Sequence, residues 1–237
     1  MMNKRKTKET ETFVLQYDEV LEQFIEKSIE IANEKMPIIE KLFNFDKNKI
    51  GKIKASFFTK REDFVSYIQS LTNGHTPPVW ASGCFYNNEI QTLLDVNNPK
   101  KMAYKTHTLI HEYIHLVIDN EIYQKYNIPR IRWFDESFAN YLDGSQDQYT
   151  KQEFATLYNR LKDIKDFDLS ILNDINKVTT DSYNGYDMFI VIGRYIFENK
   201  LEKEMLNSFS KSDETVKALG KTILAESLEY LEKKYSL

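Results

Sequence analysis

Two histidines and a glutamate lie close together in the segment 108–120, which reads TLIHEYIHLVIDN. His111 and His115 are four residues apart, so on a helix their imidazoles project from the same face and can bind one metal ion. Glu112, next to the first histidine, is then placed to act as general base on a metal-activated water. His107 would extend this face by one turn. The spacing predicts a zinc site; the alternative is a core helix in which the histidines occur by chance.

A catalytic zinc ion needs a third protein ligand and an open position for water. Downstream, the segment 131–144 (IRWFDESFANYLDG) places Glu136 among apolar residues, where burial of an unpaired carboxylate would be costly. Because metal binding would remove that cost, Glu136 is the predicted third ligand, with Asp135 as the competing carboxylate. The alternative is that Glu136 faces solvent or pairs with Arg130 or Arg132, which are close in sequence.

Together, HEYIH and WFDESFANYL resemble the gluzincin metallopeptidases of the MA clan, which include thermolysin-like and aminopeptidase-like zinc hydrolases. In this family HExxH is followed by a glutamate ligand on a second helix, which in the aminopeptidase-like branch reads WxxEGFA. Four residues of the chain match that helix: Trp133, Glu136, Phe138 and Ala139. Ser137 replaces the glycine, and the twenty residues between His115 and Glu136 make a slightly longer gap than either branch usually shows.

The resemblance implies a compact peptidase MA-like domain that hydrolyses peptide bonds with zinc, bound by His111, His115 and Glu136, and with Glu112 as general base. The aminopeptidase-like branch also stabilises the oxyanion with a tyrosine that opens a helix. Tyr186, at the start of YDMFIVIGRYIFENK, would occupy that position.

Several details of this resemblance stay open. Tyr183 is the alternative oxyanion donor, and Tyr186 could equally be a packed aromatic residue. Asp119 and Asn120 follow the motif where the two branches carry a residue that orients an imidazole, but either could instead cap the helix end. In this clan a strand beside the zinc helix pairs with the extended substrate, and 79–86 could be that strand. Its GCFYN stretch does not match the GAMEN-type motif of the aminopeptidases, so endopeptidase and exopeptidase activity both remain open.

The elements that must position these residues follow from the hydrophobic pattern. Alternation of apolar and polar residues predicts strands at 11–17 and 52–58, and a hairpin formed by 79–86 and 89–96. Helical spacing predicts the remaining elements, at 18–43, 61–71, 101–120, 133–143, 151–164, 186–200 and 215–235. A sheet followed by helices predicts an α+β fold, with a small mixed sheet lobe and then a mainly helical lobe.

The resemblance makes this α+β fold zincin-like, with the active-site helix between the two lobes. Few glycines and prolines, and no low-complexity linker, separate the halves. We therefore interpret 1–237 as a single metallopeptidase-like domain, with a strand, helix and sheet part at 1–100 and a helical part at 101–237.

Composition narrows the partners of the 237-residue chain. Its net charge of −4 comes from interspersed acidic and basic residues, which argues against nucleic acid as the main partner, and the basic run 3–8 is predicted to be a solvated tail. Cys84 is the one cysteine, so an intrachain disulfide is excluded and a reducing compartment fits. The sequence has no apolar run of about 18 residues and no signal-peptide pattern at its start, so we expect no membrane span and a cytoplasmic location.

The expected partner is a peptide or protein substrate, and the oligomeric state is not readable. Two alternatives to the enzyme remain. The first is a non-catalytic, zinc-containing peptide-binding module that uses the same ligands. The second is a metal-free structural domain in which HEYIH is coincidental.

Overall fold

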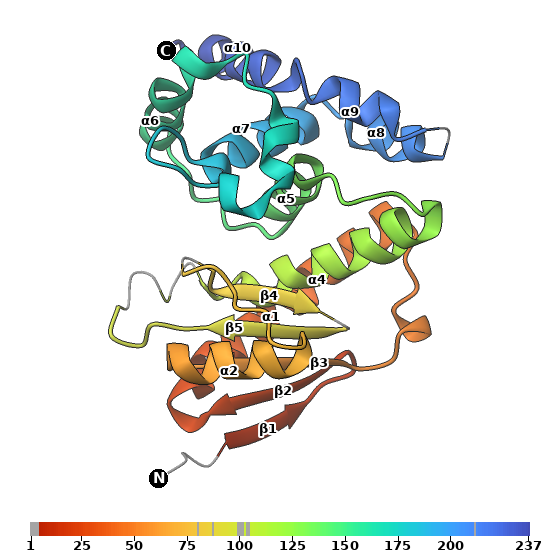
Figure 1. Ribbon diagram of the computed structural model, residues 1–237, viewed down its shortest axis with the longest axis vertical. Coiled ribbons are helices and arrows are strands. Elements are labelled where there is room, and N and C mark those ends of the chain that lie inside the picture. Colours follow the sequence, from red (N-terminus) through yellow and green to blue (C-terminus); the bar gives the residue numbers. More distant parts are fainter. Residues whose placement is uncertain (1–4, 80, 87, 99–101, 103–104, 211) are drawn as a thin grey trace. The chain divides into compact units, whose positions relative to one another are not determined.

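The computed structural model describes residues 5–79, 81–86, 88–98, 102, 105–210 and 212–237 (Figure 1). The chain divides into two compact units, Met1–Val117 and Ile118–Leu237. The predicted α+β class is confirmed, because a small mixed sheet forms in one part of the chain and another part is mainly helical. Whether the chain acts as a single metallopeptidase-like domain stays a prediction.

The sheet belongs to the first unit and has, among the described residues, the strand order β1-β2-β3-β5-β4. Its strands are β1 (Arg5–Glu9), β2 (Phe13–Asp18), β3 (Ile53–Phe58), β4 (Gly83–Tyr86) and β5 (Glu89–Leu93). β2, β3 and β5 run parallel, whereas β1 and β4 are antiparallel to their neighbours. The predicted hairpin is thus confirmed as β4 and β5, although Asn87 in its turn lies outside the described residues. β4 ends the strand order and therefore forms an edge.

Helices pack on both faces of this sheet (Figure 1). The helices of the first unit are α1 (Glu22–Phe43), α2 (Arg61–Leu71) and α4 (Thr108–Ile118), with short 3-10 turns η1 (Glu19–Leu21) and η2 (Lys47–Lys49). Successive strand residues point to opposite faces, so Phe57 packs against Phe24 of α1 while Phe58 packs against Phe64 of α2. Tyr113 of α4 contacts Phe13, whose strand partner Ile53 shares the face of Phe57. α1 and α4 therefore lie on one face and α2 on the other.

The expectation that the basic N-terminal run is a solvated tail is wrong, because Arg5–Glu9 form the edge strand β1. The Arg5 guanidinium lies 4.6 Å from the centre of the Phe58 ring, and Lys6 forms an ion pair with Glu22 at 2.9 Å. Charged side chains on an exposed edge discourage pairing with other chains. They also leave β1 without the apolar alternation that predicts a strand.

The helix predicted at 101–120 has different bounds. α4 begins at Thr108, and the chain continues beyond it as a π-helical segment, η3 (Asp119–Gln124). Residues 99–101, 103 and 104, which include part of the predicted start, lie outside the described residues. Because the helix does not end at Asn120, the interpretation of Asp119 or Asn120 as a helix cap is wrong. A π-helical turn inside a helix is often found at functional sites.

The second unit is built from helices around an aromatic core. Its helices are α5 (Arg132–Leu142), α6 (Lys151–Leu161), α7 (Gly185–Glu198), α8 (Glu202–Phe209), α9 (Glu214–Leu219) and α10 (Ile223–Tyr235), with 3-10 turns η4 (Lys162–Ile164), η5 (Leu169–Asn173) and η6 (Ile175–Lys177). Ring contacts of 4.4 to 5.0 Å join Phe138 to Phe134 and Phe197. Phe209 contacts Phe134 at 4.9 Å, which places α8, absent from the predicted elements, on the same core.

One helix predicted for this unit is in fact two separate helices. The segment 215–235 forms α9 and α10 separately, and Gly220 follows the first of them. A Cβ at Gly220 would lie 2.8 Å from the indole nitrogen of Trp133, so this turn comes close to α5. The helical pattern continues across the break because both helices bury apolar residues. None of the helices in the described part of the chain combines the length and the apolarity that crossing a membrane requires.

Candidate functional site

Helix α4 carries the two histidines on an otherwise apolar element. Seven of its eleven residues are completely buried, namely Leu109, Ile110, Tyr113, Ile114, Leu116, Val117 and Ile118. The Tyr113 hydroxyl donates a hydrogen bond of 2.9 Å to Glu40 of α1. Burial, with a smaller effect of this hydrogen bond, raises the pKa of Tyr113. Apolar packing and this partly buried hydrogen bond fix α4 on the sheet unit.

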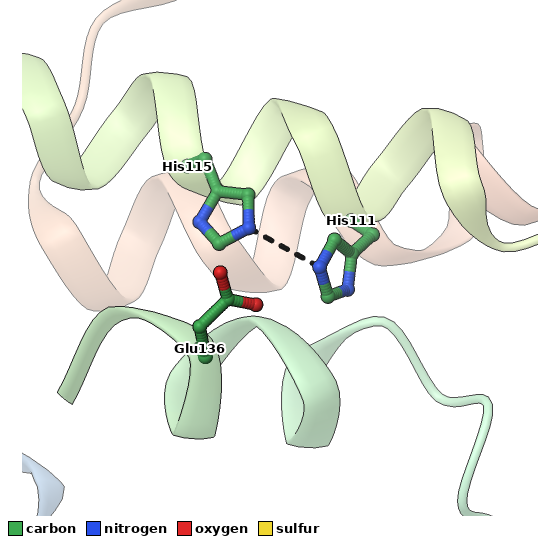
Figure 2. A group of neighbouring side chains, drawn as sticks. All are labelled: His111, His115 and Glu136. Carbon is green, nitrogen blue, oxygen red and sulfur yellow. Dashed lines mark hydrogen bonds between the residues drawn. The ribbon is translucent and has the colours of Figure 1, made fainter. Parts of the chain in front are cut away.

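The two imidazoles point their Nε2 atoms at each other. These nitrogens are 3.1 Å apart, and the ring centres are 4.8 Å apart with the rings nearly perpendicular (Figure 2). Zinc–nitrogen bonds of about 2.0–2.1 Å at a tetrahedral angle would hold two such atoms roughly 3.3 Å apart. The observed distance therefore suits two ligands of one ion. Since both histidines belong to one helix, their spacing depends only on the helix repeat and their side-chain rotamers.

Glu112 lies on the same helix and is 7% exposed. Its carboxylate reaches the edge strand β4, because a Cβ added at Gly83 would come closer to Glu112 Oε1 than 3.0 Å. A buried carboxylate at a strand edge can exchange protons with a group bound there while bulk water is largely excluded. Its assignment as the general base stays a prediction.

Glu136 lies on α5 and is 5% exposed, so the alternative that it faces solvent is wrong. Its Oε1 accepts hydrogen bonds from Arg130 at 3.3 Å and from Arg132 at 3.4 Å, so the alternative in which Glu136 pairs with an arginine is borne out. Asp135, also buried, forms an ion pair with Arg130. A carboxylate has about four lone-pair positions, so arginine pairing and metal ligation are compatible. Arginines in these places would orient the ligand.

His111, His115 and Glu136 form a group that could hold a metal ion. One ligand atom from each residue can be chosen so that all three lie within 4.8 Å of one another (Figure 2). Two imidazoles and a carboxylate are a donor set that binds catalytic metal ions in proteins. The competing carboxylate Asp135 is not part of this group among the described residues.

The two candidate oxyanion donors differ in their hydrogen bonds. The Tyr183 hydroxyl donates to the backbone carbonyl of Lys177 at 2.8 Å, so its single proton is already used. Tyr186 is the second residue of α7, where its backbone N–H donates to the Asn184 side chain, and its ring packs edge-on against Phe189. The role of Tyr186 as oxyanion donor, with Tyr183 as the alternative, stays a prediction.

Sequence reasoning missed two features that support these residues. The Tyr113–Glu40 hydrogen bond joins residues 73 positions apart, and no local pattern signals it. The approach of Glu112 to Gly83 likewise depends on how α4 packs against β4. A glycine inside a predicted strand was the available signal, since such a glycine often marks a close approach of another group.

The remaining histidines and the cysteine take ordinary places. His75 is exposed in its turn. The backbone carbonyl of His107 accepts from the N–H of His111 at 2.9 Å, as in a helical turn. Cys84 is partly buried and packs against the apolar cluster of Phe58, Phe64 and Ile68, as a small hydrophobic residue would.

Comparison with known proteins identifies no relative of this chain. No family model, curated protein or solved structure matches the chain. The resemblance to gluzincin metallopeptidases therefore rests on the residues and motifs of the chain itself.

Proposed function

We propose that this protein is a zinc metallopeptidase of the gluzincin type, which hydrolyses peptide bonds. The observation that supports it best is the group of His111, His115 and Glu136, whose ligand atoms lie within 4.8 Å of one another. The 3.1 Å distance between the two imidazole nitrogens fits a shared ion without any rearrangement of α4. Glu112, adjacent to the first ligand, supplies the further group that hydrolysis requires.

The donor set favours zinc. Two histidines and one glutamate are the protein ligands of one class of catalytic zinc sites, and three ligands leave a position for water or substrate. Bound zinc would supply a Lewis acid that polarises a carbonyl and lowers the pKa of a water molecule. Arg130 and Arg132, which donate to Oε1, would hold the Glu136 carboxylate in one orientation.

The residues of the chain would perform the proton transfers. Glu112 would accept a proton from the attacking water at a carboxylate oxygen and deliver it to the leaving amine nitrogen. The Tyr186 hydroxyl would donate a hydrogen bond to the oxyanion that develops on the former carbonyl oxygen. β4 is an edge strand in the described sheet, so an extended peptide could add to it through backbone hydrogen bonds.

The test compares wild type with Glu112→Gln, which preserves shape and removes the base. Both proteins, purified without a histidine tag, should contain about one zinc per chain by elemental analysis. The variant should cleave a peptide library about 10²- to 10⁴-fold more slowly. Undiminished cleavage by the variant would show that Glu112 is not the base.

The same proteins, with a measurement of peptide binding added, test the alternative, a zinc-containing module that binds peptides without cutting them. The position of β4 at the end of the strand order, among the described residues, supports such a module as well as an enzyme. Zinc and peptide binding in wild type, with intact peptide recovered after long incubation, would establish it.

A further inference from the structure

Gly83 opens the edge strand β4 and pairs with Thr92 of β5. Its backbone φ lies outside the left-handed region, so an alanine could adopt the same conformation. Glycine within a strand is unfavourable, since it has no side chain to pack and loses more backbone freedom on folding. The backbone conformation of β4 therefore does not explain why position 83 is a glycine. The explanation must lie in the space around it.

That space is occupied by side chains of α4. A Cβ at Gly83 would lie closer than 3.0 Å to Glu112 Oε1, 3.3 Å from Glu112 Cδ and 3.4 Å from Thr108 Cγ2. The first contact would require the carboxylate to move, and the second is tight. The Glu112 carboxylate thus fills the volume that a methyl group would take at position 83.

The neighbouring residue shows that the approach is specific to one face of β4. Cys84 points to the opposite face, toward Phe58 and Phe64. Gly83 thus lies on the other face, where a side chain at this position would meet Glu112. Because Glu112 Oε1 is the end of a flexible side chain, an added methyl group would displace the carboxylate while leaving the backbone in place.

We infer that Gly83 is a positioning residue for Glu112: by lacking a side chain it lets the carboxylate rest against β4, at the edge where a peptide would pair. The inference rests on the proposed function in so far as it assigns Glu112 a catalytic task. The closeness of Gly83 and Glu112 does not depend on that task.

The first test is Gly83→Ala, with Cys84→Ala on the opposite face of β4 as the matched control. Gly83→Ala should fold and retain zinc, and its kcat should fall about 10²-fold with KM little changed, since a displacement of about 1 Å costs that much. Cys84→Ala should keep its kcat. An unchanged kcat in Gly83→Ala would overturn the inference.

A double-mutant cycle separates an effect on Glu112 from an effect on the strand. Glu112→Asp withdraws the carboxylate by one methylene group and so leaves room for the methyl. In that background Gly83→Ala should cost less than about 3-fold, because the two changes share one contact. An equal loss in both backgrounds would show that Gly83 acts through β4 alone.

A measurement on metal-free protein keeps the inference separate from the proposed function. The ¹³C resonance of the Glu112 side-chain carboxyl group should shift in Gly83→Ala and stay in place in Cys84→Ala. An unmoved resonance in Gly83→Ala would overturn the inference. If wild type cleaves no peptide, the proposed function fails, and this resonance still decides whether Gly83 positions Glu112.

Discussion

The helices α4 and α5 supply candidate ligands by different physical means. On α4, His111 and His115 are one turn apart, so the helix repeat sets the 3.1 Å distance between their Nε2 atoms. On α5 there is one ligand candidate, Glu136, and its carboxylate is held by Arg130 and Arg132. The first arrangement needs only a stable helix. The second needs charged partners, because a buried carboxylate without them would be costly.

The two helices also pack differently. α4 is anchored by side chains, through the aromatic contacts of Tyr113 and its hydrogen bond to Glu40. α5 approaches α7 at its backbone, since a Cβ at Gly193 would come closer than 3.0 Å to the backbone oxygen of Ser137. Side-chain contacts can adjust to a substitution, whereas a backbone contact cannot. Substitutions should therefore affect α4 and α5 unequally.

The largest expected effect is on α4. His115→Ala should reduce the zinc content from about one per chain to none and abolish hydrolysis, because one of three protein ligands is lost. Elemental analysis of tag-free protein measures this. His75→Ala, which changes an exposed histidine in a turn, is the control and should keep its zinc. Stoichiometric zinc in His115→Ala would contradict a site built on the α4 pair.

The next effect concerns the oxyanion. Tyr186→Phe should lower kcat about 10²- to 10³-fold, as loss of an oxyanion donor does. Tyr183→Phe is its control and should keep kcat, because the Tyr183 hydroxyl donates to the Lys177 carbonyl. Steady-state kinetics on a cleaved peptide measures both. The reverse ranking would transfer the role to Tyr183.

A smaller effect is expected where arginines support Glu136. Arg132→Met keeps the length of the side chain but removes its charge, and should weaken zinc binding about 10- to 100-fold. Competition with a chelator measures the affinity. Arg160→Met is the control, since the Arg160 side chain is 61% exposed and pairs with Asp187 in the same unit. Equal affinities in the two variants would mean that Glu136 needs no support.

The backbone contact of α5 is tested by stability. Gly193→Ala should lower the free energy of unfolding by about 1–3 kcal/mol, because the Ser137 carbonyl cannot move aside as a side chain can. Gly83→Ala should lower it less, because the added methyl meets a flexible carboxylate. Urea denaturation of both variants measures the difference. If both variants lose the same free energy of unfolding, the side-chain contact of α4 and the backbone contact of α5 do not differ in this way.

The smallest expected effect is on the anchor of α4. Tyr113→Phe should cost about 1 kcal/mol at neutral pH through loss of the hydrogen bond to Glu40. Because burial raises the pKa of Tyr113 in the folded state, the unfolded chain releases this proton first as pH rises above about 10, so stability falls there. Tyr113→Phe should lessen that fall. Urea denaturation at neutral and alkaline pH measures this, and an equal fall of stability in wild type and Tyr113→Phe would contradict the prediction.

Local patterns predicted most elements well. The helix predicted at 61–71 matches α2, and the strand predicted at 52–58 nearly matches β3, because burial on one face leaves a regular spacing in the sequence. β1 was missed because its side chains are charged and partly exposed. The break between α9 and α10 was missed because it depends on the approach of Gly220 to Trp133, far away in the chain.

The sequence by itself determined that His111, Glu112 and His115 lie on one helix in ligand spacing, because helix geometry is local. It also pointed to Glu136, through the apolar residues around that carboxylate. Only the tertiary structure decided that Glu136 rather than Asp135 joins the group with the histidines, and that Gly83 makes room for Glu112. Contacts of this kind join segments distant along the chain, so no spacing in the sequence encodes them.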